Sequence, residues 1–305
     1  MKIFGHRGMG ELSFHPEGEN TLDAFKKAVL TGVDGIELDV QLTADGHVIC
    51  FHDKTIKRFI DNAGAQSLDS LKVQNLTLAQ IKKLNALSQI TTFQDALEFM
   101  RTQSVVDVIV DMKGHDTKRI LTDRIAQSVE ASGFPEERLS YCGFNPSFTH
   151  RLASKKPLWN IYPTFNSTVF PLPEFIAKKP RLEGIAKGFM RHAGYLAIDG
   201  MPISFNDPDD GYYSLFSEKK LEEVIFRSTS GFHMTFDDFV DFEDEVLEVL
   251  ARTGTSVFIY PRGEQKPHVQ ERVHHFVQRH AQSDQIHLIT NRPSEMVGLR
   301  NEATL

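Results

Sequence analysis

The sequence predicts an α/β fold with a mainly parallel sheet, organised as one domain over residues 1–305. Strand-like and helix-like segments alternate from end to end, and no low-complexity linker divides them. The length of 305 residues suits a single barrel with insertions, and the 40% apolar content can supply a sizeable core. We find no repeat at solenoid spacing. These observations favour one α/β domain over a repeat array or several small domains.

The first elements are a short strand before His6 and a helix over residues 20–30. Asn20 is expected to cap the start of the helix, and Gly32 follows its end. Leu22, Phe25 and Val29 fall on one helical face, which predicts the side that packs on the sheet.

A hairpin is expected next, because Asp45-Gly46 separates two strands over residues 35–41 and 47–52. The link is too short for a helical crossover, so any barrel is irregular here. The remaining strands are expected over residues 105–112, 139–143, 158–162, 195–198, 256–260 and 285–290. The remaining helices are expected over residues 117–132, 218–226, 243–251 and 268–280. Residues 165–238 are the least regular, and we interpret them as an insertion over one face.

Charge and cysteine content limit the classes of partner. The net charge of -7 argues against bulk attraction to nucleic acid, so an anionic substrate needs a local positive site. Cys50 and Cys142 imply no disulfide framework. The chain has no run of about 20 apolar residues and no apolar signal segment before the first strand. We therefore expect a cytoplasmic protein without a transmembrane segment that acts on a small molecule.

Two carboxylates stand two residues apart on the strand over residues 35–41. Alternation places Glu37, Asp39 and Gln41 on one face. A solvated strand face is the plain interpretation, and a metal site is the alternative. A divalent cation would relieve the repulsion between the carboxylates, and oxygen ligands suit Mg²⁺ or Ca²⁺.

A second polar pair ends the strand over residues 105–112. Asp111 and Lys113 share a face there. They could form a surface ion pair, or a third metal ligand beside a phosphate-binding ammonium. His6 and His52 also stand at the ends of apolar strands, where one can donate a proton and the other accept one. Arg7 can clamp a phosphate with two hydrogen bonds.

These motifs, taken in order, resemble the signature of the glycerophosphodiester phosphodiesterases, which have a TIM-barrel fold. They are His6-Arg7-Gly8, Glu19-Asn20-Thr21, Gly35-Ile36-Glu37-Leu38-Asp39-Val40, Thr43, Asp45-Gly46 and His52-Asp53. The likeness continues in Asp111-Met112-Lys113 and in Ile289-Thr290-Asn291-Arg292-Pro293, and it is thin over residues 165–238. It implies an irregular (β/α)8 barrel that hydrolyses glycerophosphodiesters to glycerol phosphate and an alcohol.

The resemblance also implies a role for each matching residue. The implied roles are His6 and His52 as general acid and base, Glu37, Asp39 and Asp111 as ligands of Mg²⁺ or Ca²⁺, Arg7 and Lys113 as phosphate-binding groups, Glu19 and Asn20 as supporting residues, and Tyr260 as a residue lining the substrate pocket.

The chain departs from the family pattern at three places. Glu17 and Glu19 both stand where the family has one glutamate, and we favour Glu19 because it directly precedes Asn20. Asp111 replaces a longer glutamate. Asn291 replaces a common aspartate, a change we assign to packing.

Other activities remain open on the same barrel. A phospholipase D of the venom sphingomyelinase type or an opine-phosphate phosphodiesterase would form a cyclic phosphate. A binding protein without turnover is the alternative from another class.

Overall fold

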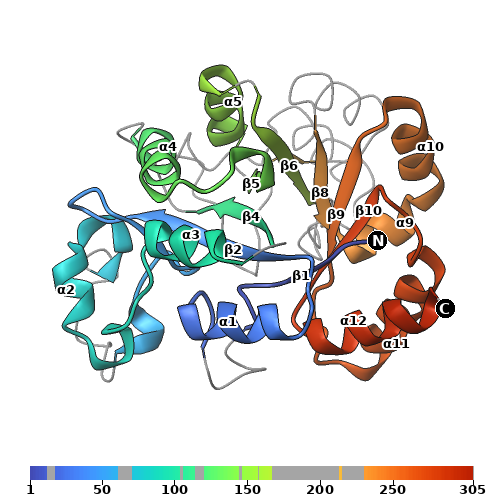
Figure 1. Cartoon of the computed structure of the whole chain (residues 1–305), viewed down its shortest axis with the longest axis horizontal. Coiled ribbons are helices and arrows are strands. Elements are labelled where there is room, and N and C mark those ends of the chain that lie inside the picture. The colour runs from blue at the N-terminus through green and yellow to red at the C-terminus, as the bar shows by residue number, and fades with distance from the viewer. Residues whose placement is uncertain are drawn as a thin grey trace, which may run out of the picture.

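The protein, seen in a computed structural model, is built around eight parallel strands closed into a barrel (Figure 1). The structure describes residues 1–11, 18–60, 71–103, 106–113, 120–143, 146–156, 158–166, 213–214 and 230–304. The barrel strands, in order around the ring, are β1 (Ile3–Gly5), β2 (Gly35–Leu42), β4 (Asp107–Met112), β5 (Leu139–Gly143), β6 (Asn160–Asn166), β8 (Gly231–Thr235), β9 (Ser256–Tyr260) and β10 (Ile286–Thr290). The ring closes because β1 pairs in parallel with both β10 and β2. The predicted TIM barrel is confirmed.

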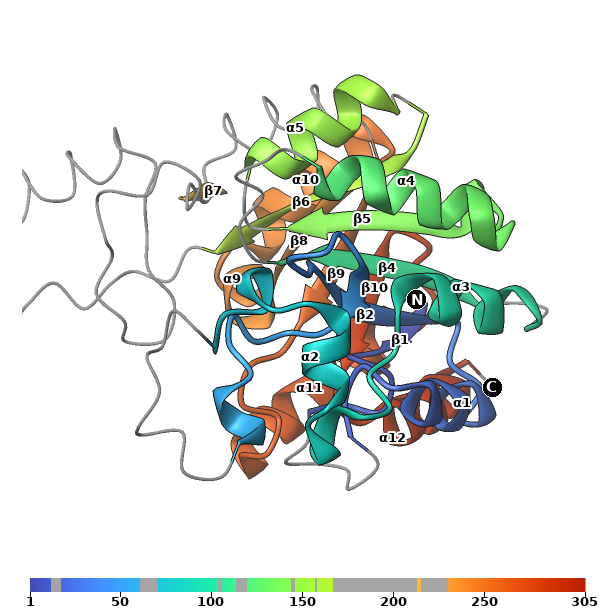
Figure 2. The ribbon, with the colours of Figure 1, turned by 90° about the vertical axis from the view of Figure 1, so that its left-hand side faces the viewer.

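Helices surround these strands, as Figure 1 shows. They are α1 (Leu22–Leu30), α2 (Leu78–Lys82), α3 (Phe93–Arg101), α4 (Leu121–Ser132), α5 (Pro146–Lys155), α9 (Phe236–Asp241), α10 (Glu243–Thr253), α11 (Pro267–His280) and α12 (Pro293–Ala303). In Figure 2 the arrows of β5 and β6 point the same way, as parallel pairing requires. The carboxyl ends of all eight barrel strands therefore meet at one mouth, where TIM barrels carry their active sites.

The strands are apolar on both faces below this mouth. Their outward side chains, such as Ile36, Leu38 and Val110, are fully buried against the helices. The barrel interior holds a separate apolar cluster of Phe4, Ile109, Cys142, Tyr162, Phe258 and Ile289. The Phe4 and Phe258 rings meet edge to face at 5.1 Å, and burying each ring contributes about 2 kcal/mol. This apolar cluster fills the barrel interior beneath the mouth, so the polar side chains nearer the carboxyl ends of the strands face only the mouth.

The predicted hairpin is also confirmed and makes the barrel irregular. β3 (Val48–Cys50) runs antiparallel to β2, with Val40 opposite Cys50, and Gly46 takes the left-handed conformation (φ 83°) that the tight turn needs. The chain after β3 packs into a second, smaller core made of Ile49, Phe51, Ile56, Leu71, Val73, Ile81, Leu87 and Ile90. His52 thus comes from an excursion between β2 and β4 rather than from a barrel strand.

Several expected boundaries are wrong. Thr21 rather than Asn20 caps α1: the Thr21 hydroxyl accepts a hydrogen bond from the backbone N–H of Ala24 at 3.1 Å. The helix expected over residues 117–132 is observed as α4, and the strand expected over 158–162 as β6.

The segment interpreted as irregular, residues 165–238, extends too far. Its last residues form β8 and the start of α9, and its short β7 (Tyr213–Ser214) pairs with β6. The expected strand over residues 195–198 and helix over residues 218–226 lie outside the described residues.

The α1 cap gives a measurable stability effect. Thr21→Ala is expected to lower the free energy of unfolding by about 1 kcal/mol, because one N–H of the first turn loses its acceptor. Urea denaturation would measure the change. Leu30→Ala, at an 85% exposed position of the same helix, serves as the control and should change little. Equal losses in both variants would show that the cap bond does not stabilise the fold.

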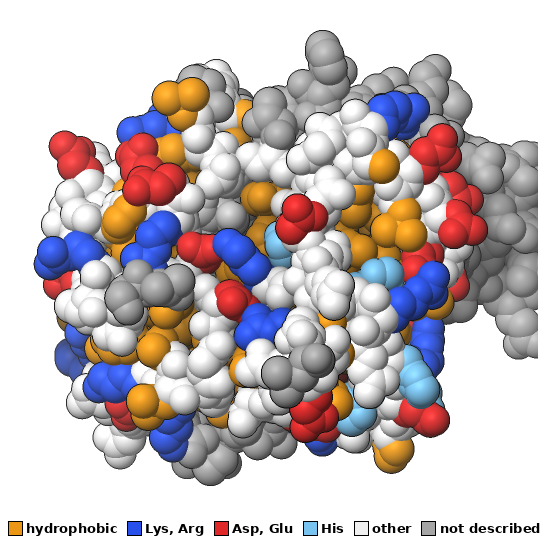
Figure 3. All heavy atoms as spheres, turned by 45° about the vertical axis from the view of Figure 1, so that its right-hand side comes forward, with side chains coloured by type: hydrophobic (Ala, Val, Ile, Leu, Met, Phe, Trp, Pro, Cys, Tyr) orange, Lys and Arg blue, Asp and Glu red, His pale blue; other side chains and the backbone are white. Residues whose placement is uncertain are grey.

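The surface carries mixed charge. On the face shown in Figure 3, acidic and basic side chains are interspersed with apolar ones. No helix among the described residues combines the length and the apolar character needed to cross a bilayer.

Candidate active site

Three buried carboxylates lie together at the mouth of the barrel. Glu37 and Asp39 come from the inward face of β2, and Asp111 comes from the neighbouring β4, paired in register with Asp39. One oxygen from each lies within 4.8 Å of the others. Burial raises the pKa of Glu37 well above its usual range, and the carboxylates of Asp39 and Asp111 raise it further. Three carboxyl groups at this separation can all ionise only beside a compensating positive charge.

The donor set fits a divalent cation. Asp111 Oδ1 is buried and has no hydrogen-bond partner among the residues that the structure describes. A buried acceptor without a donor is costly, and a cation bound by three carboxylate oxygens would remove that cost. Hard oxygen donors are suited to Mg²⁺ or Ca²⁺ and do not by themselves distinguish the two. The clustering of Glu37, Asp39 and Asp111 predicted from the sequence is therefore observed.

Two cations lie against the carboxylates. Lys113 Nζ is 2.7 Å from Asp111 Oδ2 and 3.4 Å from Asp39 Oδ1. Arg7 Nε is 3.1 Å from Asp39 Oδ2, and Arg7 Nη1 is 3.2 Å from Glu19 Oε1. Burial opposes ionisation of Asp39, but the Arg7 guanidinium outweighs it and holds the pKa of Asp39 well below its usual range. Asp39 is thus an anion, with Arg7 and Lys113 on either side.

The supporting residues orient these groups. Asn20 takes a left-handed conformation (φ 57°), which asparagine tolerates. Its Oδ1 accepts from the Asp39 backbone N–H at 3.0 Å, and its Nδ2 donates to Asp39 Oδ2 at 2.9 Å. Glu19 lies between two arginines, since Arg58 Nη2 is 2.5 Å from Glu19 Oε1. Asn20 therefore orients Asp39 through two hydrogen bonds, and Glu19 forms an ion pair with Arg7. Neither residue belongs to the three-carboxylate cluster.

His6 is held by the residue that we assigned to packing. Its Nδ1 is 2.7 Å from Asn291 Oδ1, which also accepts the Glu11 backbone N–H at 3.1 Å. Because the Glu11 donor identifies that atom as the amide oxygen, His6 Nδ1 must carry a proton. Burial, with a smaller contribution from the Arg7 cation, lowers the pKa of His6 to about 3. His6 is therefore neutral, with the lone pair on Nε2, and Asn291 fixes its tautomer.

Asn291 is in turn held in place by Glu264. The buried carboxylate of Glu264 accepts from the Asn291 backbone N–H and from the Thr290 hydroxyl, both at 2.6 Å. The packing interpretation of Asn291 is thus wrong. Sequence reasoning missed the contact because Asn291 and His6 are 285 positions apart.

His52 has a charged partner instead. Its Nδ1 donates to Asp53 Oδ1 at 2.9 Å, and Arg58 Nε lies 2.9 Å from Asp53 Oδ2. The Gln41 amide donates to the backbone carbonyls of Phe51 and Asp53, at 2.9 and 2.8 Å, on either side of His52. The two histidines therefore differ: a neutral amide faces His6, and a carboxylate faces His52. No motif in the sequence pointed to Arg58, which lies in a short 3-10 helix (Lys57–Phe59) after β3.

Two more polar side chains lie on the wall of the barrel opposite β2 and β4. His233 of β8 and Tyr260 at the end of β9 are in ring contact at 4.6 Å, and the His233 imidazole is 3.2 Å from the Thr164 hydroxyl. Tyr260 is an expected pocket residue, whereas His233 was not predicted. The inward alternation of β8 could have identified it, but the strand was assigned to the irregular segment.

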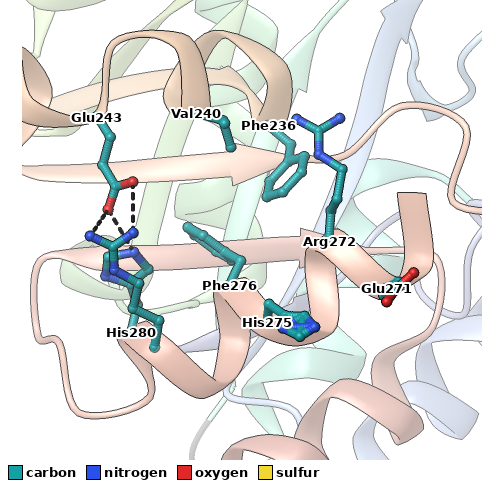
Figure 4. Close-up of a pocket in the computed structure, with 9 residues that line it drawn as sticks. Phe236, Val240, Glu243, Glu271, Arg272, His275, Phe276 and His280 are labelled. Carbon is teal, nitrogen blue, oxygen red and sulfur yellow. Dashed lines mark hydrogen bonds and ion pairs between the residues drawn. The ribbon is translucent and has the colours of Figure 1, made fainter. Parts of the chain in front are cut away.

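A cavity of about 380 Å³ lies elsewhere, on the outer surface between α9 and α11 (Figure 4). Glu243 contacts two of its side chains, with Arg279 at 3.1 Å and His280 at 3.3 Å. The lining includes none of the candidate site residues.

Comparison with known proteins agrees with this arrangement. The model of the glycerophosphoryl diester phosphodiesterase family matches residues 6–172, more than half of the chain. A glycerophosphodiester phosphodiesterase of Caldanaerobacter subterraneus is 50% identical over 68 residues, 22% of this chain and 25% of that protein. Bovine glycerophosphodiester phosphodiesterase 1 is 27% identical over 212 residues, 65% of this chain and 57% of that protein. The matches thus span less than two thirds of both relatives.

Solved structures show the same fold at low identity. A glycerophosphodiester phosphodiesterase from Parabacteroides distasonis has a TM-score of 0.65 at 16% identity, covering 100% of this chain and 98% of that one. An Oleispira antarctica phosphodiesterase, solved with the product sn-glycerol-3-phosphate, has a TM-score of 0.59 at 18% identity, covering 99% and 97%. With the family match over more than half of its length, the chain belongs to the glycerophosphoryl diester phosphodiesterase family.

Proposed function

We propose that the chain is a divalent-metal-dependent phosphodiesterase that hydrolyses glycerophosphodiesters to glycerol phosphate and an alcohol. The observation that carries this proposal is the three-carboxylate cluster beside two histidines, in a chain whose family match includes these motifs. The relatives named for this activity and the neighbour bound to glycerol phosphate support the substrate class. Location in the cytoplasm stays a prediction from the sequence.

The residues present divide the work of such a reaction. Glu37, Asp39 and Asp111 would hold Mg²⁺ or Ca²⁺, which when bound supplies positive charge to the phosphoryl oxygens. Arg7 and Lys113 would neutralise further phosphate charge, as the resemblance implies. Arg7 and Lys113 each form an ion pair with a carboxylate of the cluster in this structure. Each would therefore contact the phosphate while still paired with that carboxylate.

The different partners of the histidines support a division of roles. The Nε2 lone pair of His6 would accept the proton of the attacking water as its oxygen bonds to phosphorus. His52, whose Nδ1–H donates to the Asp53 carboxylate and is oriented by it, would donate a proton to the leaving alcohol oxygen as its bond to phosphorus breaks. One proton is thus taken up and one delivered in each turnover.

Product analysis tests the proposal. We expect release of glycerol phosphate from glycerophosphocholine and glycerophosphoethanolamine with Mg²⁺ or Ca²⁺, and none with a chelator. A cyclic phosphate product would instead indicate attack by a neighbouring hydroxyl of the substrate. Metal binding without product from any diester would support a binding protein, and no release with any metal would refute the proposed substrate class.

A further inference from the structure

One buried histidine at the mouth of the barrel has no role in the chemistry described above. His233 is 5% exposed, and its Nδ1 lies 3.2 Å from the Thr164 hydroxyl oxygen. Its Nε2 is buried and makes no hydrogen bond within the described part of the chain. Buried polar atoms are nearly always paired, so a lone one at an active-site mouth indicates a missing partner.

The hydrogen bonds around Thr164 determine which tautomer of His233 is present. The Thr164 hydroxyl oxygen already accepts the backbone N–H of Gly143 at 3.2 Å. The Thr164 proton itself has one acceptor among the described residues, which is His233 Nδ1. If Nδ1 accepts, the proton of the neutral ring is on Nε2. Burial lowers the pKa of His233 to about 3, so the ring is neutral. His233 therefore presents one N–H donor without a formal charge.

The position of this donor is set by the strand order. In the eight-strand ring, β8 is four strands from β2 in both directions, and β9 is likewise opposite β4. His233 and Tyr260 thus form the wall across the barrel from Glu37, Asp39 and Asp111. The contact of the His233 ring with Tyr260, the last residue of β9, places the ring at the same mouth.

The chemistry of this wall suits an uncharged polar group. The phosphate charge would be matched by Lys113, Arg7 and a cation held by the three carboxylates, all on the other side. A neutral imidazole N–H beside a phenol ring is instead complementary to a hydroxyl. We propose that His233 donates a hydrogen bond to a hydroxyl of the substrate's glycerol moiety and thereby sets specificity for glycerophosphodiesters. The inference rests on the proposed phosphodiesterase activity.

Single-deoxy substrates isolate this contact. We would measure kcat/KM for glycerophosphoethanolamine and for its two analogues that each lack one glycerol hydroxyl. One analogue keeps the hydroxyl next to the phosphate-bearing carbon, so a reaction through that hydroxyl stays possible. The variants are His233→Phe, which keeps a ring against Tyr260, and His233→Gln, which keeps an N–H donor.

His233→Phe is expected to lower kcat/KM for glycerophosphoethanolamine about tenfold to a hundredfold, the effect of one lost buried hydrogen bond. For the analogue that lacks the partner hydroxyl, the same substitution should change kcat/KM less than about threefold. His233→Gln should restore much of the discrimination between the substrates.

Equal losses on all three substrates would overturn the inference, because a merely structural histidine would act in that way. No change on any substrate would also overturn it. Thermal unfolding of each variant checks folding, and His233→Gln carries the test if His233→Phe does not fold. Wild-type protein inactive on every diester would refute the proposed function itself, and the inference with it.

Discussion

Replacement of His52 by alanine is expected to lower kcat for glycerophosphodiester cleavage by about a hundredfold to ten-thousandfold, the usual contribution of a general acid. The alkoxide leaving group of such a diester is a poor one unless a proton reaches its oxygen. His52 is the histidine whose Nδ1 donates to a carboxylate, so Nε2 is the nitrogen that can deliver a proton to the leaving oxygen. Release of glycerol phosphate at saturating substrate would measure kcat.

His47→Ala provides a matched control at the nearby turn between β2 and β3. His47 is 56% exposed and faces Asp45 rather than the three-carboxylate cluster. Its removal should leave kcat within about twofold, as for most surface substitutions. A kcat for His52→Ala within tenfold of wild type would exclude His52 as the main proton donor.

Glu37→Gln is expected to have two opposite effects on stability. In the metal-free protein it replaces a buried carboxyl group, whose ionisation burial and the neighbouring carboxylates oppose, by a neutral amide, so the melting temperature should rise. With Mg²⁺ or Ca²⁺, wild type should gain about 2.7 kcal/mol of stability when the free ion is at a hundred times its dissociation constant. The variant should lose most of that gain, and its activity with it.

Thermal unfolding with and without each ion measures both effects. Glu130→Gln, at an exposed position of α4, removes the same charge outside the site and should keep the wild-type response to metal. If Glu37→Gln gains as much stability from the ion as wild type does, Glu37 is not a ligand. If wild type gains none from either ion, the proposed metal dependence fails.

Much of the site follows from strand periodicity. The alternation in residues 35–41 predicted that Glu37 and Asp39 share a face, and the convergence of parallel strand ends brought Asp111 beside them. These predictions succeed because a strand fixes the side-chain direction at every second residue. The barrel itself followed from the βα alternation and the family resemblance.

Contacts between distant segments could not be predicted in this way. Asn20 and Thr21 are equally good caps by local chemistry, and the choice depends on Asp39, which occupies the Asn20 side chain. Asn291 looks like a packing change until His6 is brought beside it. β8 was missed because Gly231 and His233 break its apolar pattern, although all five of its residues are buried.

The excursion that carries His52 has a consequence for the behaviour of the protein in solution. Its small core, from Ile49 to Ile90, is separate from the main core, whereas Glu37, Asp39 and Asp111 are in the barrel. Cooperative units of this kind can open at lower free energy than the whole molecule. Sub-global opening of the excursion would remove His52 and Arg58 while the carboxylates stay in place. Amide hydrogen exchange should therefore be faster around Phe51 than around Leu38, and resistance of the barrel to heat need not equal persistence of a complete active site.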